Sequence, residues 1–326
     1  MTDSYSITDF ETIKADWDRI LSVDPNTNIF LTHLWQQTWW DIMSDPHQDL
    51  LLVKCINNEC LSGIAPLTRE GGSVTFLGGT DLWDIHDFII TPGMESPFFD
   101  CLLDFLDKED WDTVKLESIP EWSSTLLNLP AKATNRGYTA TVDHEDSLMG
   151  VSLPGSWDEY LGTLRKKDRH ELRRRLRRLE ESVEYRVVEM DSYDEINQYI
   201  DNFLELMGQS RDEKSEFLTP ERDSFFRKLC SRLAQKDLIR LCFLEVDGIK
   251  TAATLSFDYN DMIYLYNSGH NPEYSSLGSS FLLKAICIRK AIQKGKNYFD
   301  LLRGTEPYKQ HLGAVPRELF RLTLSR

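Results

Sequence analysis

Two β-hairpin patterns constrain the fold of this 326-residue chain more than any other sequence feature. In the second half, the Asp-Gly dipeptide at 247–248 separates two alternating apolar runs, 239–246 and 249–257, and this combination favours a two-residue hairpin turn. In the first half, the polar residues 57–59 (NNE) separate a similar pair of runs. The two turns are about 190 residues apart, and each hairpin follows two predicted helices, so the sequence indicates two halves with one order of elements.

The second half has the clearer pattern, with the predicted order β-α-α-β-β-β-α-β-α-β. Its helix over 220–235 has a strong start signal, because Thr219 suits the N-cap and Pro220 suits the first helical position. The first half repeats this order with one additional short strand. We expect an α+β chain of two domains, 1–153 and 154–326, each a mixed central sheet flanked by helices. The predicted strands are 5–8, 51–56, 60–67, 73–77, 88–90, 113–117, 138–142, 148–153, 185–190, 239–246, 249–257, 262–267, 298–302 and 319–324. The predicted helices are 10–21, 32–43, 98–106, one beginning at 123–127, 192–207, 220–235, 279–294 and a short one within 305–313.

A basic run, RKKDRHELRRRLRR, occupies residues 165–178 and holds nine of the 37 Lys and Arg residues, although the chain carries a formal net charge of −16. A positive stripe on an acidic protein favours a phosphate-bearing partner or a particular acidic surface, and we expect no binding to duplex DNA. The spacing predicts a helix over 157–181 with leucines on one side and arginines at every fourth position. The arginine row either binds anions or is a solvated strut between the domains that pairs with acidic residues. The leucines are Leu161, Leu164, Leu172, Leu176 and Leu179, and the arginines are Arg165, Arg169, Arg173 and Arg177.

Composition favours a soluble, cytoplasmic protein. No apolar run approaches the roughly 20 residues that span a bilayer, so we expect no membrane insertion, and the polar start MTDSYSITDFETI lacks the features of a secretory signal. The cysteines form no CxxC pair and lie in apolar segments, which favours buried free thiols. The histidines show no HExxH spacing, and we expect no catalytic metal. The cysteines are Cys55, Cys60, Cys101, Cys230, Cys242 and Cys287.

Seven strings along the chain occur in the same order as in a known family. In the first half they are FLTHLWQQTWW (30–40), GIAPL (63–67), and FLGG followed by DLWDIHDFIITPG (76–93). In the second half they are LRKKDRHELRRRLRRLEE (164–181), LEVDGIKTAATLSF (244–257), SSLGSSFLL (275–283) and FDLLRGTEPYKQHLG (299–313). Together they resemble the tandem GNAT-fold acyltransferases of the BioF2-like/CelD type, which are related to the Fem-type aminoacyltransferases.

The resemblance implies two GNAT-like domains and transfer of an acyl or aminoacyl group to an amine bound between them. The expected donor is an acyl-coenzyme A thioester, used as a cosubstrate with no tightly bound cofactor. The expected acceptor is a small-molecule or cell-envelope precursor amine. Gly278 stands where the glycine turn of such proteins meets the diphosphate of coenzyme A. The segment SSLGSS has one glycine and no basic residue, which departs from the usual signature and keeps a charged tRNA as an alternative donor.

The helix predicted to begin at Ser279 would offer unpaired backbone N–H groups and the positive end of its dipole to a phosphate. Gly278 would let a ligand approach the backbone closely. We predict a donor-binding turn here, and an ordinary Ser/Gly helix cap is the alternative. The turn consists of Ser276, Leu277, Gly278, Ser279 and Ser280.

Residues 299–309 contain the predicted catalytic groups. Acyl transfer to an amine needs a group that accepts a proton, donors for the developing oxyanion and a group that protonates the leaving atom. Glu306 or Asp300 would accept the proton, Tyr308 would donate one, and Lys309 would bind a phosphate or carboxylate. No Ser-His or Cys-His constellation is visible, so we expect direct attack without a covalent enzyme intermediate. A structural turn with a surface ion network is the alternative.

Further aromatic and polar side chains are candidates for substrate binding, and each has a structural alternative. Aromatic rings on strands and helices pack in cores. Polar residues in loops form local hydrogen bonds, and arginines on a helix face are commonly solvated. The candidates are Arg303, Tyr264, Tyr266, His270, Arg169, Arg173, Trp39 and Asp84.

The sequence leaves three functions open. The leading hypothesis is an N-acyltransferase that uses a thioester donor. A Fem-type aminoacyltransferase that uses charged tRNA is favoured by the basic run and the atypical turn. A non-catalytic binding module in envelope polysaccharide synthesis is the third, because the same turn is compatible with a fold that has lost its chemistry.

Overall fold

The computed structural model describes residues 3–326, and Met1 and Thr2 lie outside the described residues. The chain divides into two compact units. Residues up to Ser147, together with Arg317–Arg326, form unit 1, and Leu148–Pro316 form unit 2. The chain therefore passes between the units twice, and the last strand belongs to unit 1. The sequence-based boundary at 153/154 assigns this strand to the second domain, because a strand's pairing partner cannot be read from its place in the chain.

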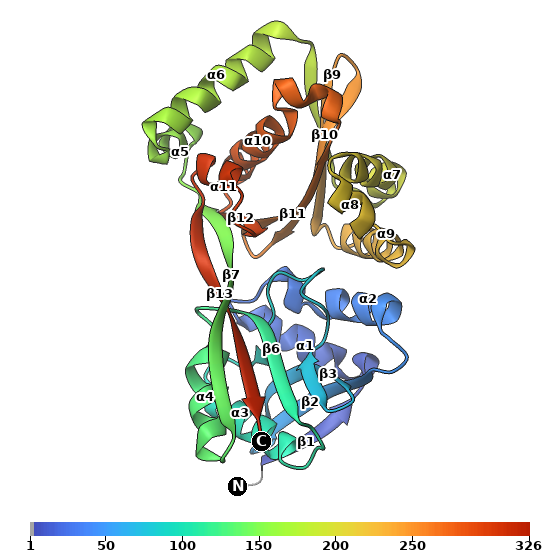
Figure 1. Ribbon diagram of the computed structural model, residues 1–326, viewed down its shortest axis with the longest axis vertical. Coiled ribbons are helices and arrows are strands. Elements are labelled where there is room, and N and C mark those ends of the chain that lie inside the picture. The colour runs from blue at the N-terminus through green and yellow to red at the C-terminus, as the bar shows by residue number, and fades with distance from the viewer. Residues whose placement is uncertain (1–2) are drawn as a thin grey trace. The chain divides into compact units, whose positions relative to one another are not determined.

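Unit 1 contains a mixed sheet with the strand order β1-β2-β3-β4-β6-β13-β7, and β5 pairs with β3. Helices α3 and α4 lie on one face of this sheet, and α1 and α2 lie on the other (Figure 1). The strands are β1 (Asp3–Thr8), β2 (Asp49–Asn57), β3 (Cys60–Glu70), β4 (Ser73–Phe76), β5 (Ile89–Ile90), β6 (Thr113–Pro120), β7 (Thr139–Ser152) and β13 (Val315–Ser325). The helices are α1 (Phe10–Val23), η1 (Ile29–Leu31), α2 (His33–Met43), α3 (Glu95–Leu106) and α4 (Ser124–Asn135).

Unit 2 contains the strand order β7-β12-β11-β10-β9-β8, to which β7 contributes its last residues. Helices α7 and α9 cover one face of this sheet and α10 covers the other (Figure 1). The strands are β8 (Tyr185–Met190), β9 (Ile239–Val246), β10 (Ile249–Tyr259), β11 (Met262–His270) and β12 (Tyr298–Arg303). The helices are α5 (Trp157–Thr163), α6 (Lys166–Ser182), α7 (Tyr193–Gln209), α8 (Asp212–Phe217), α9 (Pro220–Ala234), η2 (Pro272–Leu277), α10 (Ser279–Gln293) and α11 (Pro307–His311).

The two units share one topology. In unit 1, α3 connects β4 to β6, and these two strands pair in parallel. In unit 2, α10 makes the same connection between β11 and β12, which also pair in parallel. Each parallel pair lies beside an antiparallel hairpin, β2–β3 in unit 1 and β9–β10 in unit 2. The repeated order that the sequence indicates is therefore a repeated arrangement of strands and crossover helices.

Three predicted elements differ from the structure. The segments 138–142 and 148–153 belong to one strand, β7, since the backbone stays extended through the polar residues between them. The basic helix 157–181 is two helices, α5 and α6, which meet at Leu164 and Arg165, both in extended conformation. A short helix, α8, interrupts the loop between the two long helices of unit 2. None of the helices within residues 3–326 is long and apolar enough to cross a membrane.

Candidate functional site

The N-terminus of α10 lies in a turn that only glycine adopts without strain. Gly278 has φ +70 and ψ 33, which is the left-handed region, and it ends η2 and begins α10. No side chain caps this helix, so its first N–H groups remain available to a ligand. Two hydroxyls of the turn are committed to structure, because Ser275 donates to the Pro272 carbonyl and Ser279 donates to the Thr251 carbonyl at 3.3 Å. The donors that remain for an anion therefore include the backbone N–H groups at the start of α10.

One arginine of the basic helix α6 lies beside this turn. A Cβ atom placed on Gly278 would lie 3.0 Å from Nη1 of Arg175, and the Arg175 guanidinium stacks over the Phe281 ring at 5.3 Å. Its Nε also donates to Glu171 at 2.7 Å, which holds the side chain in place. The helix dipole and this guanidinium together make the turn attractive to a phosphate.

Sequence reasoning selected Arg169 and Arg173 on this helix and missed Arg175. Arg173 is exposed and Arg169 is half-buried, while the buried side of α6 consists of Leu172, Leu176 and Leu179. Arg175 is half-buried and flanks this leucine stripe. Its place next to the stripe was the signal that could have found it, since a long side chain there reaches the helix that α6 packs against.

The end of β12 has a sharp bend that Asp300 supports. Asp300 is fully buried, and its Oδ1 accepts a hydrogen bond from the N–H of Leu302 at 2.8 Å. Leu302 has φ +59, a conformation that is costly for a leucine without such support. The Asp300 carboxylate therefore stabilises the bend, whereas the sequence suggested Asp300 as one of two possible proton acceptors.

Lys309 holds the turn that follows β12. Its side chain is only 3% exposed, and Nζ donates to the carbonyls of Leu302 and Gly304 at 3.1 and 3.0 Å and to that of Arg303. The same Nζ lies 3.0 Å from Oε2 of Glu306. Gly304, with φ +97, leaves room for this carboxylate, since a Cβ there would approach Oε2 to 2.8 Å. The turn residues and Lys309 therefore fix the position of Glu306.

The two predicted proton carriers have the protonation states that their roles require. Burial would raise the pKa of Glu306, but the Lys309 ammonium, a backbone hydrogen bond and the Arg211 charge together outweigh it, and the pKa falls below its usual value. Glu306 is therefore a carboxylate at neutral pH. Burial raises the pKa of the Tyr308 hydroxyl, and the nearby Glu306 carboxylate raises it further, so Tyr308 stays protonated. A candidate base, Glu306, and a candidate acid, Tyr308, therefore lie close together at the start of α11.

A buried lysine, Lys284, and a half-buried one, Lys214, which sequence reasoning missed, lie near these residues. Lys284 on α10 is 4% exposed, donates to Oγ of Ser280 at 2.7 Å and lies 5.0 Å from the centre of the Tyr308 ring. Lys214 on α8 donates to Oδ1 of Asn267 at 2.7 Å and to the Ser268 carbonyl. Lys214 lies in the polar helix α8, whose sequence offers no signal of burial, whereas Lys284 lies between Leu283 and Ala285 in the apolar helix α10, and that apolar run was the signal that could have found it.

The remaining candidates of unit 2 lie on β11. Tyr264 is 1% exposed and its hydroxyl contacts Sδ of Met262 at 3.5 Å, while the Tyr266 ring packs against Phe226 and Phe257. These placements match the aromatic-packing alternative. His270 is half-buried, and burial followed by the charges of Lys284, Lys214 and Arg211 lowers its pKa. Arg303, at the end of β12, is half-buried.

The candidates of unit 1 lie in or near its aromatic cluster. Trp39 is 7% exposed and meets Trp83 edge-to-face at 6.3 Å. Trp83 also stacks on His86 at 4.9 Å. Asp84, which lies between Trp83 and His86 in the sequence, is half-buried. Trp39 therefore takes part in core packing, the alternative that the sequence left open. Five of the cysteines are buried as expected, whereas Cys60 is exposed at a hairpin turn.

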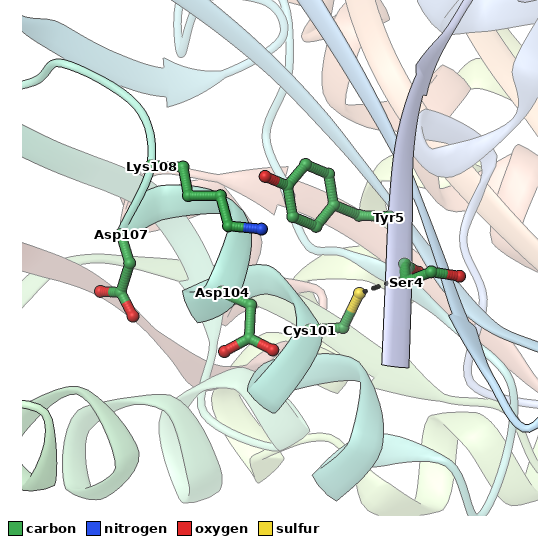
Figure 2. A pocket seen from close by; sticks show the side chains of 6 residues that line it. All are labelled: Ser4, Tyr5, Cys101, Asp104, Asp107 and Lys108. Carbon is green, nitrogen blue, oxygen red and sulfur yellow. Dashed lines mark hydrogen bonds between the residues drawn. The ribbon is translucent and has the colours of Figure 1, made fainter. Parts of the chain in front are cut away.

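Unit 1 also has two hollows that contain none of the predicted residues. The hollow in Figure 2 lies between β1 and α3 and has a volume of about 620 Å³. Its acidic side chains already serve structure, because Arg136 pairs with Asp104 and Asp107 at 2.6 and 2.8 Å. A second hollow of about 280 Å³ lies near Trp122 and Asp87. The predicted donor-binding and catalytic residues, within 276–309, lie in unit 2.

Comparison with known proteins identifies the class of this fold. Residues 166–310 match the family model described as an acetyltransferase (GNAT) domain. These residues are therefore similar to a GNAT domain, and the chain as a whole has the tandem GNAT fold that its sequence resembles. A search of curated proteins found no match.

Solved structures similar to this one cover nearly the whole chain. The structure of FemX superimposes with a TM-score of 0.68 at 14% identity, covering 98% of this chain and 97% of FemX. L-PGS from Bacillus licheniformis gives a TM-score of 0.57 at 11% identity over 96% of this chain and 91% of its own. A tandem GNAT protein from the clavulanic acid biosynthesis pathway gives 0.51 at 13% identity over 98% of both chains. At these identities the comparisons establish the fold.

Proposed function

We propose that this protein is an N-acyltransferase that moves an acyl group from an acyl-coenzyme A thioester to an amine. The observation that carries the proposal is the N-terminus of α10 at the Gly278 turn, which has no side-chain cap, with Arg175 beside it. Backbone N–H groups, the positive end of the helix dipole and a guanidinium are the groups that bind a diphosphate. This arrangement supplies the basic group that the segment SSLGSS itself lacks.

The strands beside α10 support the same donor. β11 and β12 pair in parallel only from Met262–Tyr298 to Tyr264–Asp300, although β11 continues to His270. Beyond Tyr264, the backbone groups on the β11 edge that faces β12 do not take part in this parallel pairing. An extended donor arm with amide groups is suited to pair with such an edge by strand addition. Coenzyme A has an arm of this kind between its diphosphate and its thiol.

The residues of the α11 turn would then carry out the transfer. The amine nitrogen attacks the thioester carbonyl carbon, the C–S bond breaks, and the nitrogen loses a proton. In the proposal Glu306 accepts this proton directly or through water, and Tyr308 protonates the leaving thiolate. Lys309 positions Glu306, and Asp300 stabilises the bend of β12 by accepting the hydrogen bond from the Leu302 N–H.

A Fem-type aminoacyltransferase that uses charged tRNA is the second candidate. The exposed arginines of α6 favour it, since Arg173, Arg177 and Arg178 face solvent, where they can contact a phosphate backbone. The likeness to FemX over nearly the whole chain is compatible with it at the level of the fold.

The test is thermal unfolding with acetyl-coenzyme A, free coenzyme A and tRNA. A ligand of the native state raises the melting temperature by mass action, so saturable stabilisation by coenzyme A compounds is expected. Gly278→Trp should abolish it by filling the turn. Gly93→Trp is the matched control, because Gly93 has φ +83 and precedes α3, the equivalent helix of unit 1.

The outcomes separate the candidates. Stabilisation by thioesters that survives in Gly278→Trp would place the donor elsewhere. Stabilisation by tRNA alone, decreasing steeply with salt, would replace the thioester proposal with the Fem-type one. No stabilisation by either would favour the binding module.

A further inference from the structure

Lys284, which is buried, and Lys214, which is half-buried, form no hydrogen bond or ion pair with a carboxylate in the described part of the chain. Within residues 3–326, Lys284 donates only to the hydroxyl and carbonyl oxygens of Ser280, and the second contact is long, at 3.5 Å. Lys214 donates only to the side chain of Asn267 and the carbonyl of Ser268. An ammonium has three donors and is costly to bury without a counter-charge, so each lysine retains unused capacity for an anion.

The surroundings of these lysines are strongly cationic. Arg211 from the start of α8 adds positive charge near Lys214, and both Lys214 and Lys309 on α11 add it near Lys284. The carboxylate that acts on both lysines is Glu306, and it is already paired with Lys309 at 3.0 Å. A cluster with four cations around one engaged carboxylate has the charge pattern of an anion site.

The position of the cluster connects it to the transfer chemistry. Ser280, the partner of Lys284, is in the first turn of α10, where the donor is proposed to bind. The Tyr308 ring lies beneath the Lys284 ammonium, and Glu306 lies on the same turn as Tyr308. An anion held by these lysines would therefore lie beside the reacting atoms.

We propose that one of the two substrates carries a carboxylate that Lys284 and Lys214 bind, so that the enzyme selects an acidic acyl group or an acidic amine. This inference rests on the proposed N-acyltransferase function. The carboxylate would accept charge-assisted hydrogen bonds from both ammonium groups and supply the missing counter-charge. Selection would follow, since an uncharged substrate would leave the cluster unpaired.

The protonation of the lysines provides a second readout. Burial lowers the pKa of Lys284 to about 7, with the Lys214 charge adding to the effect, and burial followed by Arg211 lowers the pKa of Lys214 to about 8. Glu306 opposes both shifts, and Lys309 adds to the shift of Lys284. The charges of both lysines also contribute to lowering the pKa of His270 on β11. A bound carboxylate would raise both lysine pKa values, so binding near pH 7 should take up protons.

Matched ligand pairs test the inference by isothermal calorimetry. Succinyl- and butyryl-coenzyme A have equal chain length and differ by one carboxylate, and 4-aminobutyrate and butylamine form the equivalent acceptor pair. If the donor carries the carboxylate, succinyl-coenzyme A should bind at least about tenfold more tightly, with proton uptake seen by comparing Hepes and Tris buffers. If the acceptor carries it, 4-aminobutyrate should show that preference instead.

Lys284→Met should remove the preference and the proton uptake together. Lys294→Met is the control, since Lys294 lies at the end of the same helix, is 43% exposed and pairs with Glu189. Melting curves verify that both variants are folded. If neither pair shows a preference that depends on Lys284, the inference is overturned, and the proposed function stands if coenzyme A compounds still bind. If no coenzyme A compound binds, the donor proposal fails, and the acceptor pair alone then decides the inference.

Discussion

The crossover helices α3 and α10 have the same place in their units but differ at their N-termini. At α3, Glu95 is in the first turn, and its Oε1 accepts a hydrogen bond from the N–H of Gly93 at 3.0 Å. At α10 the first turn has no acidic residue, and Arg175 lies beside Gly278. One helix therefore supplies its own negative charge, and the other leaves its positive end for a ligand. The duplicated fold thus offers two equivalent turns, of which only the second is suited to an external anion.

The strands that follow these helices share a bend but support it differently. Ser118 on β6 has φ +61 and Leu302 on β12 has φ +59, and each lies within a register shift of its strand's antiparallel pairing. The Ser118 N–H donates to Glu145 on β7 at 2.7 Å, whereas the Leu302 N–H donates to Asp300 on its own strand. The bend belongs to the fold, and the groups around it are specific to each unit.

The largest expected effect concerns the last strand. Leu322 on β13 is fully buried and belongs to the core cluster of unit 1. Leu322→Ala should lower the free energy of unfolding of unit 1 by roughly 2–5 kcal/mol. Seven of the eight tryptophans lie in unit 1, so tryptophan fluorescence during denaturant unfolding measures this. Leu283→Ala on α10 is the control in the core of unit 2. An unchanged fluorescence midpoint in Leu322→Ala would contradict the assignment of β13 to unit 1.

The second prediction transfers the acidic feature of α3 to α10. Ser280→Glu should place a carboxylate in the first turn of α10 and weaken coenzyme A binding by at least tenfold, about 1.4 kcal/mol, by repelling the diphosphate. Calorimetric titration measures the change. The reverse variant, Glu95→Gln, should leave this affinity unaltered. Equal affinity in Ser280→Glu and wild type would mean that the two helix N-termini do not differ in function.

The third prediction concerns pH. The folded-state pKa of Lys284, about 7, is below its ordinary value of 10.5, so the unfolded chain binds more protons between these values. This lysine therefore makes stability rise with pH over that window, and its buried charge costs stability below pH 7. Lys284→Met should melt at least about 2 °C higher than wild type at pH 6, with the gap closing towards pH 10. A gap that widens with pH would refute the buried-cation description.

The smallest effect is expected at two arginines of α6. Arg169→Gln and Arg173→Gln should change the free energy of unfolding by no more than about 0.5 kcal/mol, because Arg173 is exposed and the hydrogen bond of the half-buried Arg169 to the Gly162 carbonyl is long, at 3.5 Å. Affinity for coenzyme A should stay the same, whereas Arg175→Gln should weaken it. If tRNA binds, Arg173→Gln should reduce the slope of its salt dependence by about one. Loss of coenzyme A binding in Arg169→Gln would restore the sequence-based assignment.

The sequence predicted most elements of this fold because they depend on local signals. The two hairpins followed from turn residues between alternating runs, and Thr219 does accept the N–H of Arg222 as an N-cap. Leucine spacing identified the buried side of α6. The prediction of one long basic helix was wrong, because nothing in the local pattern marks the break at Leu164 and Arg165.

The sequence by itself determined the order of elements, the tandem GNAT class and the segments 276–280 and 300–309 in which the candidate site lies. Only the tertiary structure decided which unit β13 joins, since strand pairing is a contact between distant segments. It also decided that Asp300 and Lys309 face backbone groups, and that Lys284, Lys214 and Arg175 lie next to the site. A side chain's burial and partners depend on what packs against it from elsewhere in the chain, and periodicity within one segment does not contain that information.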